Sequence, residues 1–154
     1  MGKEIERKFL VNGDAWRALA KGTVYRQGYL STTKERVVRV RTIDEKGFLT
    51  IKGVTTGVTR AEFEYEIPTS DANLMLDNLC ERPLIEKTRY KIELGGLVWE
   101  IDEFAGDNQG LIIAEVELQD EKQQFEKPEW IGEEVSGDPR YFNSNLIKYP
   151  FTKW

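Results

Sequence analysis

Alternation of charged and apolar side chains is the feature that most constrains the fold of this chain. Near the N-terminus, Glu4, Glu6 and Lys8 would share one face of an extended strand, because successive side chains of a strand point to opposite faces. Ile5 and Phe9 would lie on the other face and pack on a core. Segments that are typical of further strands follow at 23–30, 35–42, 48–52, 60–67, 85–94, 97–104 and 111–118. The chain is therefore predicted to be mostly β-sheet.

The charges on these strands are sorted by sign. Carboxylates occupy one face of strands 3–11, 60–67, 97–104 and 111–118, and bases occupy one face of strands 35–42, 48–52 and 85–91. A single strand of this kind usually belongs to an antiparallel sheet whose charged face contacts water. Rows of one sign on several strands instead favour a closed barrel of about eight strands with the charges directed inward.

An interior lined in this way must be a polar tunnel, because buried charges cost free energy unless they are paired or hold ions. A water-filled tunnel that binds a polyanion through its bases and divalent ions through its acids would meet that cost. Arg39 and Arg41 offer planar guanidinium groups suited to phosphate oxygens. Lys8, Lys52 and Lys87 offer point charges for the same purpose.

Composition narrows the classes of function. The 154 residues are expected to form one domain, 1–154, and the net charge of −5 argues against binding to nucleic acid or to a membrane surface. The single Cys80 excludes an internal disulfide and, without a visible secretory signal, predicts a cytoplasmic protein. Histidine is absent, so any metal would be held by carboxylates, which favours hard ions such as Mg²⁺ or Mn²⁺.

A few helices are predicted between and after the strands, which makes the fold class α+β. They are expected at 15–19 behind a capping Asp14, from Thr69 or Ser70 to about Cys80, from Asp120 to about Glu126, and near 143–148. Tyr29 fits either a core position or the wall of the tunnel.

The N-terminal pattern Glu4-x-Glu6-x-Lys8 resembles the ExExK signature of the CYTH family, also called the triphosphate tunnel metalloenzymes. The resemblance continues in the order of the family through Arg26-Gln27-Gly28-Tyr29-Leu30, Arg39-x-Arg41, Thr50-x-Lys52, Arg60-x-Glu62-x-Glu64, Glu86-Lys87-Thr88-Arg89-Tyr90, Asp102, Glu115-x-Glu117, Glu133-Glu134-Val135 and Tyr141-x-Asn143. The ExExK pattern alone is weak, whereas the complete ordered set is specific and covers nearly the whole chain.

This resemblance implies an eight-stranded antiparallel barrel that forms a tunnel, with helices packed outside, a C-terminal segment near one mouth, and dependence on Mg²⁺ or Mn²⁺. The implied metal ligands are Glu4, Glu6, Asp102, Glu115 and Glu117. The implied substrate-binding residues are Lys8, Arg26, Arg39, Arg41, Lys52, Lys87 and Arg89. Glu62, Glu64 and Lys87 are the implied catalytic residues.

The activity that follows from the resemblance is metal-assisted hydrolysis of a linear triphosphate, with inorganic tripolyphosphate giving pyrophosphate and phosphate. Alternatives on the same scaffold are an adenylate cyclase and a nucleoside or thiamine triphosphatase, since a fold does not fix a function. A non-catalytic polyphosphate-binding module is a further alternative. The expected partner is a small-molecule triphosphate, and the sequence leaves room for a homodimer.

Overall fold

The strands form one continuous antiparallel sheet in a computed structural model that describes residues 2–154. Met1 lies outside the described residues, and the expectation of one domain over 1–154 stays a prediction. The strands are β1 (Lys3–Val11), β2 (Gly22–Ser31), β3 (Val37–Ile43), β4 (Lys46–Lys52), β5 (Thr59–Ile67), β6 (Ile85–Leu94), β7 (Leu97–Phe104), β8 (Ile112–Glu117) and β9 (Ile131–Glu134).

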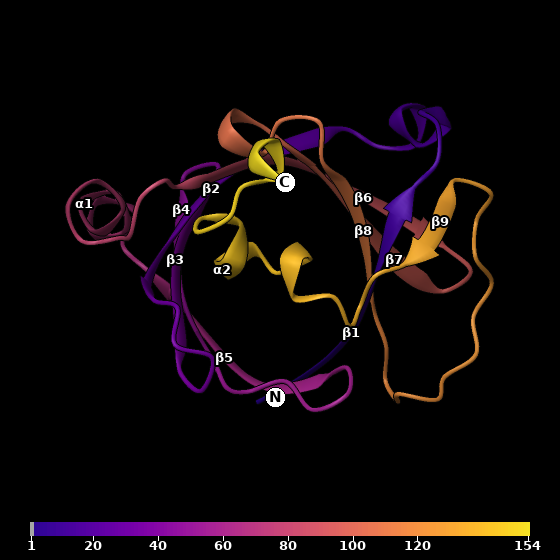
Figure 1. The fold of residues 1–154 in the computed structure, drawn as a ribbon, viewed down its shortest axis with the longest axis horizontal. Helices are drawn as coiled ribbons and strands as arrows, with labels where there is room; N and C mark the ends of the chain where they lie inside the picture. The colour runs from indigo at the N-terminus through magenta and orange to yellow at the C-terminus, as the bar shows by residue number, and fades with distance from the viewer. Residues whose placement is uncertain (1) are drawn as a thin grey trace.

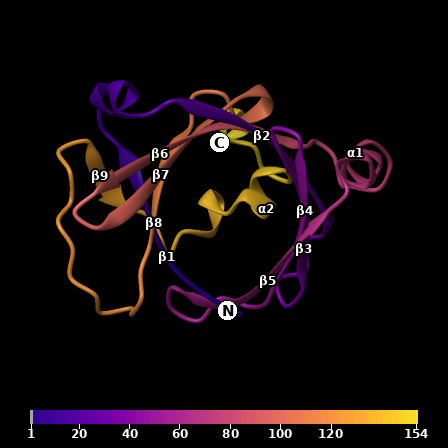
Figure 2. The same cartoon turned by 180° about the vertical axis from the view of Figure 1, so that it is seen from behind.

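The first eight strands close into a barrel. Their order around the wall is β5-β4-β3-β2-β6-β7-β8-β1, and β1 pairs with β5 to complete the ring. This closing pairing places Glu4 opposite Arg60 and Lys3 opposite Ala61. Figure 1 looks along the barrel, so the strands appear as a ring, and Figure 2 shows the same ring from behind. The predicted closed eight-stranded antiparallel barrel is confirmed.

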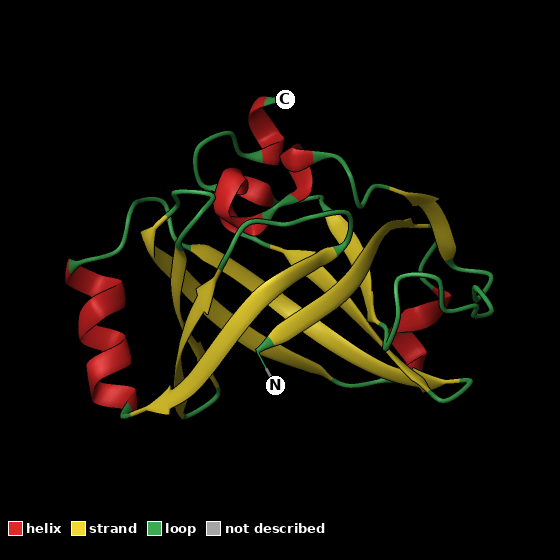
Figure 3. Cartoon of the chain, turned by 90° about the horizontal axis from the view of Figure 1, so that it is seen from below, coloured by secondary structure: helices red, strands yellow, loops and turns green. Residues whose placement is uncertain are grey.

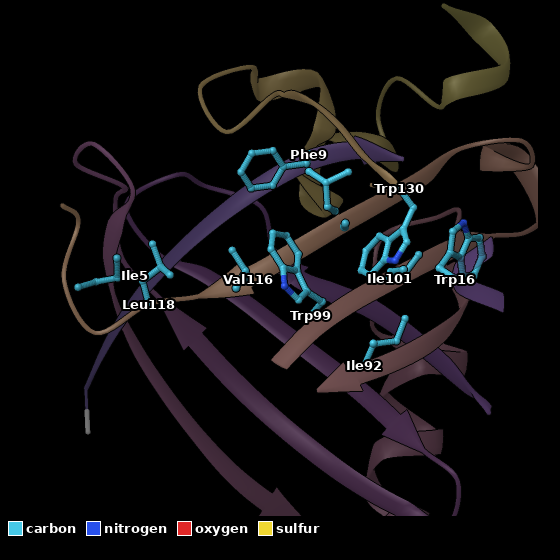
Figure 4. Close-up of a cluster of buried hydrophobic side chains, with 11 residues drawn as sticks. Ile5, Phe9, Trp16, Ile92, Trp99, Ile101, Val116, Leu118 and Trp130 are labelled. Atoms are coloured by element: carbon cyan, nitrogen blue, oxygen red, sulfur yellow. The ribbon is translucent and has the colours of Figure 1, made fainter. Parts of the chain in front are cut away.

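The largest hydrophobic cluster lies on the outside of this wall. Ile5 and Phe9 of β1 join Trp99 of β7 and Val116 of β8, and Trp130 from the following loop packs over them. Figure 4 shows these side chains gathered on one face of the β1, β7 and β8 ribbons. On β1, β7 and β8 the apolar face therefore points outward to covering segments, and the charged face points into the barrel.

Helices and the C-terminal segment cover other parts of the barrel. The helix α1 (Thr69–Asn78) lies outside β3 and β4, where Ala72 and Leu76 pack against Val40. The 3₁₀ helix η1 (Ala15–Leu19) carries the buried Trp16. The C-terminal segment, with α2 (Asn143–Leu146), lies over one opening of the barrel (Figure 3).

The local predictions for helices need three corrections. Residues 120–126 form turns and irregular structure instead of the predicted helix. Phe125 packs against the outer hydrophobic cluster and so holds this segment against the barrel. Asp14 makes no side-chain cap, and α1 begins after Pro68 without a side-chain cap. The Thr69 hydroxyl instead donates to the carbonyl of Glu45, which ties the start of α1 to the β3–β4 turn. Within residues 2–154, no helix has the length and apolar character needed to cross a membrane.

Candidate functional site

The inward-facing charges line a cavity of about 610 Å³ inside the barrel. Its charged lining comes from strands all around the wall. The charged side chains are Glu4, Glu6 and Lys8 of β1, Arg39 and Arg41 of β3, Lys52 of β4, Arg60, Glu62 and Glu64 of β5, Lys87 and Arg89 of β6, Glu100 of β7, and Glu115 and Glu117 of β8. The structure thus brings together nearly all of the residues that the sequence singled out.

Arg26 is an exception, because it lies outside the barrel. The alternation of β2 buries Tyr25 and Gln27, so Arg26 points to the opposite side. Its guanidinium binds the Asp77 carboxylate of α1 at 2.6 Å. Arg26 therefore does not line the cavity in which the other predicted substrate-binding residues lie.

Asp102 is the second exception, because it is fully buried behind the cavity lining. Its two oxygens accept hydrogen bonds from Arg89 Nε at 2.7 Å and Arg89 Nη2 at 2.8 Å. Lys87 Nζ lies 2.8 Å from its Oδ2. Burial raises the pKa of the Asp102 carboxyl, but Arg89 and Lys87 outweigh burial and lower it overall. Asp102 is a buried anchor for two bases, and not an accessible metal ligand.

Lys87 is held in place by this anchor and by the C-terminal segment. Its Nζ donates to Asn143 Oδ1 at 2.9 Å. Burial lowers the pKa of Lys87 to about 8, and the neighbouring Arg89 contributes in the same direction. Lys87 therefore loses its proton more readily than an ordinary lysine.

Arginines gather on the part of the wall formed by β3, β2 and β6. The guanidiniums of Arg41 and Arg89 lie 5.2 Å and 4.9 Å from the centre of the buried Tyr25 ring, a distance typical of cation–π contacts. Burial lowers the pKa of Arg41 to about 10, with Arg39 and Arg89 adding to the shift. Glu64 Oε2 lies 3.4 Å from both Arg39 and Arg41 and accepts from Thr50 at 3.0 Å. This group is a concentrated positive surface, partly balanced by one carboxylate.

Lysines separate the carboxylates elsewhere in the cavity. Lys52 Nζ lies 3.2 Å from both Glu4 and Glu62. Lys8 Nζ lies 3.1 Å from Glu115 and 3.4 Å from Glu6. Burial lowers the pKa of Lys8, but Glu115, Glu6 and Glu4 outweigh burial and raise it overall.

The donors of this cavity fit a hard divalent ion. Burial raises the pKa of the Glu117 carboxyl, and Glu4, Glu62 and Glu100 raise it further, so four carboxylates repel one another here. Carboxylate oxygens clustered in this way are the ligands that hard ions such as Mg²⁺ or Mn²⁺ prefer. No group of three or more acidic or cysteine side chains within residues 2–154 is arranged to hold an ion as it stands. Lys52 and Lys8 each bridge two glutamates.

Several lining residues carry no role in the sequence-based assignment. Counting back by two from Glu62 would have directed Arg60 inward. Tyr29 proves to be both a core residue and part of the cavity wall. Asn143 comes from an irregular tail without periodicity, so the alternation gives no signal for it.

A closed antiparallel barrel whose acids and bases face one another across a charged cavity defines a tunnel protein for charged ligands. A model of the CYTH domain matches residues 2–145, and this chain belongs to the CYTH family, as the resemblance predicted.

Relatives and solved structures agree with this assignment. The chain is 60% identical over 151 residues to the inorganic triphosphatase of Acetivibrio thermocellus, covering 98% of this chain and 97% of the relative. It is 38% identical over 151 residues to the inorganic triphosphatase of Nitrosomonas europaea, covering 93% and 95%. The crystal structure of an inorganic triphosphatase aligns with a TM-score of 0.64 at 35% identity, covering 93% and 96%.

Proposed function

We propose that this protein hydrolyses a linear triphosphate with the help of a divalent metal ion, and that inorganic tripolyphosphate is its substrate. The observation that carries the proposal is a cavity in which acids contact bases, as Lys52 contacts Glu4 and Glu62. A divalent ion with its polyanion would take over both partners, giving the acids a cation and the bases phosphate oxygens. The names of the relatives support the same activity.

The bases would hold the substrate extended across the cavity. Arg39, Arg41 and Arg89 present forked donors that match phosphate oxygens. Lys8, Lys52 and Lys87 are the lysines proposed to contact the same anion. Because charge on the phosphate oxygens changes during phosphoryl transfer, these contacts would stabilise the transition state as well as the bound substrate.

Glu62 and Glu64 would serve different purposes. Glu64 accepts from Thr50 and lies against Arg39 and Arg41, so it would orient the substrate-binding arginines. Glu62 contacts Lys52 and is one of the carboxylates surrounding Glu117. Glu62 would orient the attacking water and accept its proton while the bond between the terminal phosphorus and the bridging oxygen breaks. Lys87 would neutralise charge on the departing pyrophosphate.

The glutamates of β1 and β8 are the residues that would hold the metal: Glu4, Glu6, Glu115 and Glu117. Mg²⁺ or Mn²⁺ bound there would neutralise charge on the phosphate oxygens and make water a better nucleophile.

Phosphate release tests the proposal. The parent and Glu4→Ala would be assayed with tripolyphosphate and Mg²⁺, and the variant should lose about 100-fold or more in rate, since a single electrostatic contact in a transition state contributes about that much. Equal rates would contradict it. A panel of tripolyphosphate, ATP, thiamine triphosphate and pyrophosphate, with product analysis, distinguishes this activity from a cyclase or a nucleotide hydrolase. Binding without turnover at any divalent ion would identify a polyphosphate-binding module instead.

A further inference from the structure

Arg60 differs from every other base in the cavity. Lys8, Arg39, Arg41, Lys52, Lys87 and Arg89 each lie in at least one ion pair with an interior carboxylate. Within residues 2–154, Arg60 makes no such pair, although Glu4 is its direct neighbour across the β1–β5 ladder. Its Nε is buried and has no hydrogen-bond partner among the same residues, which is also true of the Nε of Arg39 and Arg41, but those two guanidiniums pair with Glu64 through Nη2. Arg60 is thus a cavity-lining cation whose donors are free.

A free guanidinium in a partly enclosed position is costly for the fold. Removing a charge from bulk water costs free energy that an ion pair or a hydrogen bond normally offsets. The other bases of the cavity would have to leave a carboxylate before they bind an anion, whereas Arg60 would not. The arrangement therefore points to a ligand that supplies the missing anionic partner.

The position of Arg60 in the barrel determines which part of an anion it can reach. It lies on β5, and Arg89 lies on β6. The order β5-β4-β3-β2-β6 places these strands four steps apart in a closed ring of eight, and therefore on opposite walls. Arg89 therefore lies on the far wall, whereas Arg41, which flanks Tyr25 together with Arg89, lies on β3, two strands away from β5. An anion held by Arg89 must extend across the cavity to meet Arg60.

We propose that Arg60 binds the distal phosphate of the substrate and so makes the site select three linked phosphates over two. This inference rests on the proposed function. A pyrophosphate held by Arg89 on the opposite wall would end before Arg60, whereas the third phosphate of tripolyphosphate would reach it. Arg60 is accordingly a substrate-binding residue that determines chain length.

The test compares Arg60→Gln with the parent, using the KM for tripolyphosphate and the inhibition constant for pyrophosphate, both with Mg²⁺. Loss of a charged hydrogen-bond donor should weaken tripolyphosphate by about 10- to 100-fold. Pyrophosphate should inhibit the parent and the variant equally. Arg60→Lys keeps the charge without the fork and should recover part of the loss. Arg26→Gln removes the same charge from the outer surface and should leave both constants unchanged.

Stability provides a second readout. Arg60→Gln removes an unpaired charge, so its melting temperature should equal or exceed that of the parent. A lower melting temperature with unchanged constants would assign Arg60 to the fold and overturn the inference. Equal weakening of both anions would overturn chain-length selection. Calorimetric binding of both anions remains decisive even for a parent that releases no phosphate, so failure of the proposed function and failure of this inference are distinguishable.

Discussion

At the scale of single residues, side chains that face the barrel interior meet partners from other strands. Glu4, Glu6 and Lys8 face the cavity, because period-two alternation in a strand fixes the side from which each side chain emerges. Asp102 also faces inward, yet two bases enclose it completely. Such pairings depend on which strands become neighbours in space, and that information is not contained in the alternation of one strand.

Lys87 should set an alkaline limit on activity. Its lowered pKa of about 8 means that the ammonium loses its proton, and with it the attraction for phosphate, as the pH rises through that value. The kcat/KM for tripolyphosphate, which reports ionisations of the free enzyme, should therefore fall above about pH 8. Lys87→Arg keeps the charge at higher pH and should move this limit upward. Identical alkaline limbs for parent and variant would contradict the assignment.

Asp102 should be a large contributor to stability. Asp102→Asn leaves Arg89 and Lys87 buried without their counter-charge, and the free energy of unfolding should drop by about 3–5 kcal/mol. Because the pKa of Asp102 is lowered in the fold, this contribution is present above its ordinary value of 3.8 and is lost as the pH falls further. Urea unfolding at neutral and acidic pH measures both effects. Asp138→Asn, at an exposed pair with Arg140, is the control and should change little.

At the scale of elements, the strands were predictable and the connections less so. β1 was expected at 3–11 and found at Lys3–Val11, because charge alternation and the following turn both mark it. β9 was not predicted. It pairs with the outer edge of β1 through an irregular register, Phe9 with Glu134 and Val11 with Ile131. A strand of four residues is too short to show a clear alternation of apolar and polar side chains, so its pairing with a distant strand cannot be predicted from its own sequence. The conformation of residues 120–126 likewise depends on tertiary packing.

The helix α2 should contribute to stability through one residue. Leu146 is fully buried and belongs to the cluster that includes Phe104 and Ile113. Leu146→Ala should lower the free energy of unfolding by about 2–5 kcal/mol, from lost burial and the resulting cavity. Leu79→Ala, at an exposed position 66% accessible to solvent just after α1, is the matched control and should cost far less. Chemical denaturation of both variants makes the comparison, and similar losses would show that α2 is not packed as described.

At the scale of the whole molecule, the largest hydrophobic cluster lies on the outer side of the barrel wall, and a second cluster shares Tyr29 and Val37 with the cavity lining. Trp99 and Phe9 pack outside, whereas the cavity is lined by charges. The sorting of charges by strand predicted that the charged faces point into the barrel, because a sheet that faces water does not need rows of charges of one sign. Arg26 shows where the inference weakens, since a basic residue within a matching motif was assigned inward although its place in the alternation directs it outward.

Removal of divalent metal should abolish activity and leave the fold intact. The outer clusters do not depend on an ion, so EDTA should stop phosphate release while the circular dichroism spectrum stays unchanged. Added Mg²⁺ should restore the rate. Unfolding by EDTA would instead indicate a structural metal, as in small domains whose folding requires one.

The outward position of Trp99 and its neighbours has a consequence for how such a protein can diversify. On β1, β7 and β8, the apolar side chains of this cluster and the charged side chains of the cavity occupy opposite sides of the same strands. Substitutions at unpaired inner positions such as Arg60 can therefore accumulate without eroding the scaffold. Descendants of one ancestral barrel could in this way acquire new ligands by exchanging alternate residues, while every strand keeps its place.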